Sequence, residues 1–99
     1  MPKYTNRNLR RDILRTLNYI PLTPFRAVAI LNALRPTGYD DLTISSLEGQ
    51  INYLEEKGYI KKSTAINEIL GEKIELIQIT ARGIDILEGN SSDVGVACG

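Results

Sequence analysis

The stretch from Leu42 to Glu88 constrains the fold of this chain more than any other segment. It opens with Thr43, a residue type that caps the free N–H groups at the start of a helix. Apolar side chains then recur at helical spacing, and Gly58 follows where a left-handed closure of the helix needs glycine. We therefore predict a helix over Thr43 to Lys57. Its apolar face is formed by Ile44, Leu47, Ile51 and Leu54.

Two strand-like runs and a second capped helix follow this first helix. Residues 59–66 and 73–80 flank a polar turn at 67–72, which is the pattern of a β-hairpin. Thr80 is expected to cap a short last helix that Gly89 closes. The residues that compete for the inner face of the second strand are Ile74, Leu76, Ile77 and Ile79.

Two further helical segments precede this stretch. The segment Asn8–Tyr19 carries one apolar stripe, and Pro21 should stop the helix because a proline disfavours helical backbone in the residue before it. Thr23-Pro24 should then cap and begin a second helix. The stripe of the first helix is Leu9, Ile13, Leu14 and Leu17, and the buried side of the second is Val28, Leu31 and Leu34.

The chain of 99 residues is long enough for one small domain. We predict that this domain spans residues 1–89. From Asn90 onward the composition is small and polar, so residues 90–99 are expected to form a flexible or extended tail.

Two parts of the sequence resemble known proteins. The runs Leu47–Ile60 and Ile79–Gly89 are similar to winged-helix regulators, in which leucine, three residues and glycine close the recognition helix and threonine, two residues and glycine follow the hairpin. This resemblance implies an α+β fold, a winged helix-turn-helix with three helices, a two-stranded β-hairpin wing and a short C-terminal helix. More narrowly, Leu31–Leu34 and Arg82–Asp85, with the later Gly95-Val96, resemble a family of small proteins of Mu-like phages and prophages.

The net charge is zero, but the charges are unevenly distributed. Residues 1–35 hold seven basic side chains and one acidic side chain, whereas residues 36–60 hold one base and five acids. Such a chain is expected to have a positive face, which could meet phosphate or an acidic partner, and a negative one. A solvated helix without a partner is the alternative interpretation.

The residue types exclude most catalytic and metal chemistry. The chain has no histidine and a single cysteine, Cys98, so it cannot build a zinc site or a nucleophile–histidine pair. The paired acids Asp40-Asp41 and Glu55-Glu56 are expected to be solvated surface, because adjacent helical residues point in different directions. No glycine-rich phosphate loop is present, so we expect no enzyme, no cofactor and no metal.

The sequence also bears on the compartment. It has no apolar run long enough to span a bilayer and no secretion signal, and its one cysteine cannot form an internal disulfide. We therefore expect a protein of the reducing cytoplasm of a bacterial host cell, without a membrane partner.

Double-stranded DNA is the partner that the predicted fold favours. The outward side of the third helix should enter the major groove, where Gln and Asn pair with adenine edges and Ser with bases or phosphate. The backbone N–H groups near its start could hold a phosphate, lysines flank the wing, and arginines of the first helix could reach the backbone. The predicted DNA contacts are Thr43, Ser45, Ser46, Gly49, Gln50, Asn52, Lys61, Lys62, Lys73, Arg7, Arg10 and Arg11.

The acidic residues argue against this site, because binding to DNA depends on neutralised phosphates. The third helix contains Glu48 and Glu55-Glu56, and the wing contains Glu68 and Glu72. Two functions therefore stay open. One is a DNA-binding regulator, acting as a homodimer through the first helix and the tail. The other is a module that binds another phage protein and uses the winged helix as a scaffold.

Overall fold

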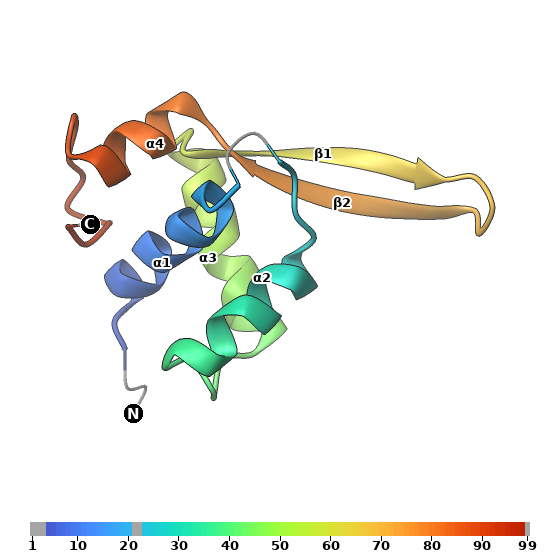
Figure 1. Cartoon of the computed structure of the whole chain (residues 1–99), viewed down its shortest axis with the longest axis horizontal. Coiled ribbons are helices and arrows are strands. Elements are labelled where there is room, and N and C mark those ends of the chain that lie inside the picture. The colour runs from blue at the N-terminus through green and yellow to red at the C-terminus, as the bar shows by residue number, and fades with distance from the viewer. Residues whose placement is uncertain (1–3, 21–22, 99) are drawn as a thin grey trace.

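The computed structural model describes residues 4–20 and 23–98. Four α-helices, one short 3-10 turn and one antiparallel hairpin make up these residues (Figure 1). In chain order they are α1 (Asn6–Asn18), α2 (Ala27–Leu34), η1 (Arg35–Thr37), α3 (Ile44–Glu56), β1 (Ile60–Asn67), β2 (Glu72–Ile79) and α4 (Ala81–Glu88). This is the winged helix-turn-helix fold, and the hairpin is its wing.

Helix α1 forms where the sequence predicts a helix, but it begins at Asn6, two residues before the expected start. Thr5 is its N-cap and accepts a hydrogen bond from the Asn8 N–H at 3.1 Å. One stripe of the helix packs into the core against α2, α3 and α4, where its side chains lose almost all contact with solvent. The buried residues of the stripe are the predicted ones, Leu9, Ile13, Leu14 and Leu17.

Helix α2 begins later than the sequence suggests. The predicted cap at Thr23-Pro24 is wrong, because Phe25 pairs with Ile77 of β2 through two backbone hydrogen bonds of 2.8 Å and so holds the chain extended. The helix starts at Ala27, and Val28, predicted as buried, points outward and is 50% exposed. Ile30 is buried in its place. The predicted helix stop at Pro21 lies outside the described residues.

Helix α3 lies within the bounds expected from the sequence. Thr43 accepts a hydrogen bond from the Ser46 N–H at 3.2 Å, and Leu42 and Leu47 on either side of this cap are both buried. At the other end Gly58 has a φ of 80°, and the Tyr59 N–H bonds to the Leu54 carbonyl at 3.0 Å. This closure sends the chain directly into β1.

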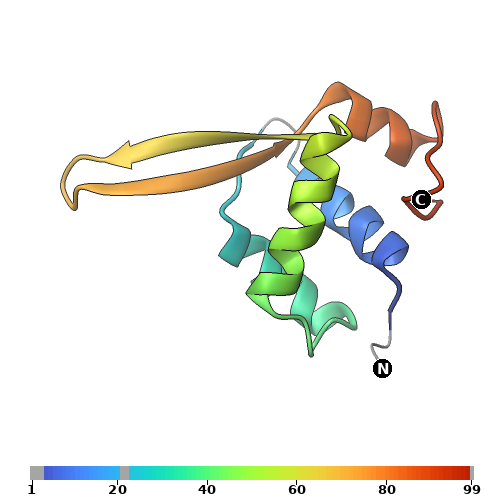
Figure 2. The ribbon, with the colours of Figure 1, turned by 180° about the vertical axis from the view of Figure 1, so that it is seen from behind.

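The interior of the body comes mainly from the four α-helices and the base of the hairpin. Leu47, Ile51 and Leu54 of α3 face α1 and α2, whereas Ile44, predicted as apolar face, is partly exposed at the start of the helix. In Figure 2, α3 runs along the front of the molecule, with α1 and α2 behind it. The side of α3 opposite its leucines is therefore turned to solvent.

The register of the hairpin shows which strand residues face the body and which face away from it. Ile60 pairs with Ile79 and Lys62 with Ile77, so these residues share the face that packs on the body. Ile77 and Ile79 are buried there, whereas Ile74 and Leu76 lie on the opposite face. Beyond this base the two strands project away from the body (Figure 1), which gives the molecule its 42 × 31 × 22 Å extents.

Residues 90–98 differ from the flexible or extended tail that the sequence suggested. They fold back over α1, and Val96 is 4% exposed and part of the core. The Ala97 N–H bonds to the Arg7 carbonyl at 3.2 Å, and the Tyr59 hydroxyl donates to Asp93 at 2.5 Å. We call residues 90–98 the strap. Val96 therefore packs between α1 and α4, a contact that the small and polar composition of the segment does not reveal.

Two glycines provide a paired test of this packing. A Cβ at Gly83 would meet the backbone carbonyl oxygen of Tyr59 and lie 2.7 Å from Cγ1 of Ile79, whereas a Cβ at Gly49 has nothing within 4 Å. We expect Gly83→Ala to lower the free energy of unfolding by about 1–3 kcal/mol. Gly49→Ala should raise it by about 0.5–1 kcal/mol, because alanine loses less backbone entropy in a helix. Urea unfolding followed by circular dichroism measures both, and equal effects of the two changes would contradict this packing.

Candidate nucleic-acid interface

The outward side of α3 carries a row of small polar residues near its N-terminus. Ser45, Gly49 and Asn52 are all exposed, and their spacing puts them on one line along the helix. Ser46 and Thr43 are exposed beside this row, but their hydroxyl groups bond to each other at 3.1 Å as part of the helix cap. The row could therefore offer side-chain amide and hydroxyl groups, with a glycine that lets another molecule come close to the backbone.

The three lysines of the wing occupy different surroundings. Lys61 is exposed and lies on the face of the hairpin away from the body, and Lys73 is exposed far along the hairpin, opposite Ile66. Lys62 is half-buried and turned toward α3. Its ammonium group donates to the Asn52 side chain and lies 3.6 Å from a carboxylate oxygen of Glu55. Lys61 and Lys73 are thus the wing cations that extend into solvent.

Acidic side chains outnumber basic ones between α3 and the wing. A hollow of about 250 Å³ separates the two elements, and Glu48, Glu75 and Lys62 line it. Glu55 and Glu56 continue the exposed acidic surface toward the end of α3. A phosphate near this hollow would be repelled, because one half-buried lysine stands among several carboxylates.

Arg10 and Gln50, both predicted DNA contacts, bind each other instead. The Arg10 Nε donates to Gln50 Oε1 at 2.7 Å, and the same guanidinium donates to the Gly95 carbonyl at 3.0 Å. Its carbon lies 3.6 Å from the centre of the Tyr53 ring. This stacked and hydrogen-bonded guanidinium joins α1, α3 and the strap, so the structure gives Arg10 and Gln50 an internal role.

Arg11 is also paired within the chain. Its Nε lies 3.0 Å from Asp12, which accepts a further hydrogen bond from the Tyr39 hydroxyl and lies 3.4 Å from Arg15. Burial alone would raise the pKa of Asp12, but the hydrogen bonds from Arg11 and Tyr39 outweigh it and lower that pKa. Burial together with Asp12 raises the pKa of Tyr39. The cluster fixes the loop before α3 to α1.

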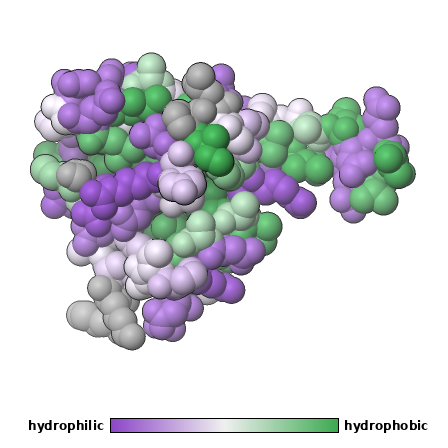
Figure 3. All heavy atoms as spheres, viewed as in Figure 1, coloured by the Kyte–Doolittle hydropathy of each residue, from purple (hydrophilic) through white to green (hydrophobic). Residues whose placement is uncertain are grey.

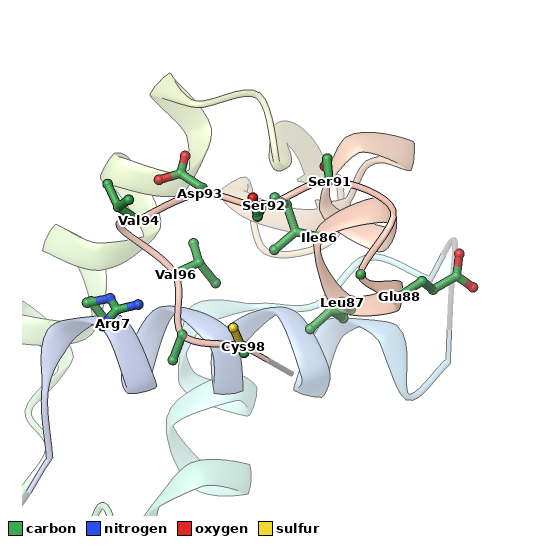
Figure 4. Close-up of a pocket in the computed structure, with 12 residues that line it drawn as sticks. Arg7, Ile86, Leu87, Glu88, Ser91, Ser92, Asp93, Val94, Val96 and Cys98 are labelled. Atoms are coloured by element: carbon green, nitrogen blue, oxygen red, sulfur yellow. The ribbon is translucent and has the colours of Figure 1, made fainter.

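Arg7, another predicted DNA contact, lies beside the strap. It borders an open hollow of about 470 Å³ that the strap and the end of α4 enclose (Figure 4). In this view Arg7 comes from α1 and Val96 reaches inward from the strap. Helix α1 lies behind α3 when the outward side of α3 faces the viewer (Figure 2). The structure therefore does not bring the arginines of α1 together with the polar row of α3.

Asp93 anchors the strap. Its carboxylate accepts the Tyr59 hydroxyl hydrogen bond and one from the Gly95 N–H at 2.7 Å, and Lys57 lies 3.9 Å away. These hydrogen bonds, that of Tyr59 first, lower the pKa of Asp93. Burial and the same contact raise the pKa of Tyr59 to about 12. Sequence reasoning missed this anchor. The two valines after Asp93 show that the segment is not purely polar, but no local signal identifies Tyr59 as the partner of Asp93.

Among residues 4–20 and 23–98, no three histidine, cysteine or acidic side chains gather in a way that could hold a metal ion. In the same residues, no helix has both the length and the apolar character that crossing a membrane requires.

Solved structures with similar folds include transcription regulators. A proposed transcriptional regulator from Thermoplasma acidophilum superposes with a TM-score of 0.72 at 20% identity, covering 84% of this chain and 76% of that one. A PadR family transcription regulator from Clostridium difficile R20291 gives 0.70 at 18% identity, over 83% of this chain and 81% of its own. A PadR-like transcriptional regulator from Bacillus cereus superposes with a TM-score of 0.68 at 18% identity, covering 82% of this chain and 75% of that one. These likenesses show the winged-helix fold. No protein-family model and no curated protein matches the sequence.

The anchor of the strap predicts a pH-dependent stability. Because the pKa of Asp93 is lowered in the folded protein, the stability that its carboxylate contributes is present above the ordinary pKa of 3.8 and is lost as the pH falls through the folded-state pKa. We expect Asp93→Asn to lower the free energy of unfolding at pH 7 by about 1–3 kcal/mol. The gap between wild type and variant should narrow as the pH drops below 3.8.

Urea unfolding at pH 7 and at pH 3 measures this gap. Asp41→Asn, at an exposed aspartate in the loop before α3, is the matched control and should change the stability little at either pH. A gap that stays constant over this range would show that the ionised carboxylate of Asp93 does not hold the strap.

Proposed function

We propose that this protein is a DNA-binding regulator of a phage or prophage. In this proposal it works as a homodimer in the cytoplasm of the bacterial host cell. The observation that carries the proposal is the polar row Ser45, Gly49 and Asn52, which is exposed on α3 beside a projecting wing. A helix presented in this way can enter the major groove while the wing lies along the backbone.

The chemistry of the row suits the reading of bases. An asparagine amide can pair with an adenine edge, a serine hydroxyl can bond to a base or a phosphate, and Gly49 lets the helix approach closely. Lys61 and Lys73 extend from the wing and can neutralise phosphates. Thr43 and Ser46 would sit at the helix start, where backbone N–H groups favour an anion.

The acidic groups on α3 are expected to weaken the binding of DNA. Glu48 and Glu55 repel phosphates, so few cations contribute and the affinity for arbitrary sequences should be low. Discrimination between sequences then depends on base contacts rather than on charge. Support for a regulatory role comes from the names of the proteins that share the fold, and support for a phage context comes from the resemblance of Leu31–Leu34 and Arg82–Asp85 described above.

A protein-binding role is the second candidate. The observation that favours it is the internal engagement of Arg10 and Arg11, which leaves the outward side of α3 acidic. In this alternative the winged helix is a scaffold, and the acidic side of α3 would meet a basic surface of another phage protein.

The salt dependence of DNA binding separates the two roles. Fluorescence anisotropy with a labelled mixed-sequence duplex should show binding at low salt that weakens as salt is added. Lys61→Ala/Lys73→Ala should reduce the slope of log K against log salt by about 2, because each lysine is expected to neutralise about one phosphate. Glu48→Gln/Glu55→Gln should strengthen binding, because the variant removes two repulsive charges from α3.

Lys57→Ala is the matched control for the loss of a cation. Lys57 is exposed at the end of α3 but lies on the side of the strap, so the salt slope should not change. Absence of binding at low salt by both the wild type and Glu48→Gln/Glu55→Gln would overturn the DNA-binding role in favour of the protein-binding one.

A further inference from the structure

We propose that the tip of the wing docks into an apolar groove on a second copy of this chain, and that two copies exchange tips in a symmetric dimer. The tip is formed by Ile66, Glu68, Ile69, Leu70 and Glu72. The groove lies at the end of α1 beside α2 and is lined by Arg15, Thr16, Tyr19, Ile20, Phe25 and Ala33. The inference concerns the homodimer of the proposed function, and it can be tested without DNA.

The tip exposes apolar side chains at the far end of a rigid turn. Ile66, Ile69 and Leu70 are 66%, 94% and 65% exposed. The Asn67 side chain accepts hydrogen bonds from the N–H groups of Ile69 and Leu70 at 3.1 and 3.2 Å, and the Gly71 N–H bonds to the Asn67 carbonyl at 2.7 Å. The turn is therefore ordered, and it holds these side chains in solvent. Clustered exposed apolar groups of this kind mark contact sites.

The turn of the tip, residues 68–72, is poorly suited to a phosphate backbone. Its charged residues are Glu68 and Glu72, both exposed, on either side of the apolar pair, and Lys73, opposite Ile66, is the next residue along β2. Figure 3 shows apolar atoms gathered at the end of the hairpin together with hydrophilic ones. An apolar surface edged by carboxylates fits an apolar surface edged by a cation, because the carboxylates keep an ionic partner when water is displaced.

The groove on the body combines an apolar lining with a basic residue. Tyr19 is 86% exposed and Ile20 is 50% exposed, and with Phe25 and Ala33 they line a hollow of about 350 Å³. The charged residue in the lining is Arg15, whose side chain is 52% exposed. Its contact with Asp12 is 3.4 Å long, and Arg15 itself is more than half exposed although Asp12 is largely covered, so the guanidinium can also reach a second carboxylate.

The geometry requires that tip and groove belong to different copies. The wing projects from the body and its tip lies at the far end of the longest axis, away from α1 and α2 (Figure 1). A reciprocal exchange buries the tip and the groove of both copies and closes the assembly at two. It also supports the outer half of a two-stranded hairpin, an element that is only marginally stable when it stands alone.

Charge reversal on either side of the contact tests it, because a mixture of the two reversed variants should bind again. In Arg15→Glu the groove repels the glutamates of the tip, and in Glu68→Arg/Glu72→Arg the tip repels Arg15. The dimer of each variant alone should therefore have a dissociation constant about tenfold higher than that of the wild type. Sedimentation velocity over a concentration series measures this constant. An equimolar mixture of the two variants should restore the dimer, because both contacts of the mixed pair then join opposite charges.

The apolar contact has its own variant and a matched control. Ile69→Ser/Leu70→Ser should weaken the dimer by about tenfold or more, whereas Val94→Ser removes an equally exposed valine from the strap and should have no effect. A monomeric wild type would overturn the proposal, as would a dimer that survives both Ile69→Ser/Leu70→Ser and Glu68→Arg/Glu72→Arg. Because no DNA is present, either result leaves the proposed DNA binding untouched. Conversely, failure to bind DNA would leave the dimer untouched.

Discussion

Burial of one side of α3 against α1 and α2 is the interaction on which the other features depend. Leu47, Ile51 and Leu54 are each almost fully buried there, and each contributes about 1.5–3 kcal/mol relative to an exposed position. This contact fixes which side of α3 is turned outward. It also fixes where the helix closes at Gly58, and so where the wing leaves the body. The polar row and the wing are consequences of apolar packing on the opposite side of the same helix.

The charge asymmetry of the sequence is resolved largely inside the molecule. Arg10 joins α3 to the strap, and Arg11 joins the Asp12 cluster that fixes the loop before α3. A basic N-terminal segment therefore serves first to hold three parts of the fold together. This explains why Arg10 and Arg11 of the basic first helix are not lined up beside the polar row of α3.

The parts of the fold that depend on local sequence could be predicted. The caps at Thr43 and Thr80, the apolar stripe of α1 and the two strands all follow from spacing and residue type, and the structure confirms them. The start of α2 could not be predicted, because the pairing of Phe25 with Ile77 joins positions far apart in the sequence. The packing of the strap and the hydrogen bond between Arg10 and Gln50 could not be predicted either. Local sequence does not show which distant residues a polar segment or a polar side chain will contact.

The candidate site was predictable to a similar degree. Which residues lie on α3 and on the wing followed from helical and strand periodicity, and Ser45, Gly49 and Asn52 do share an exposed side. What the periodicity could not give was the position of α1, which lies behind α3 rather than beside its polar row (Figure 2). The apolar tip of the wing shows the same limit: its composition is visible in the sequence, but its exposure depends on how far the hairpin projects.

The central claim is that the outward side of α3, next to the base of the wing, is where DNA binds. Titration of the ¹⁵N-labelled protein with a short duplex, followed by amide chemical shifts, tests it residue by residue. The account predicts that the largest shifts fall on residues 43–52 and on Lys61, while the amides of the strap move little. Shifts concentrated on α1 and the strap, or no shifts at low salt, would contradict it.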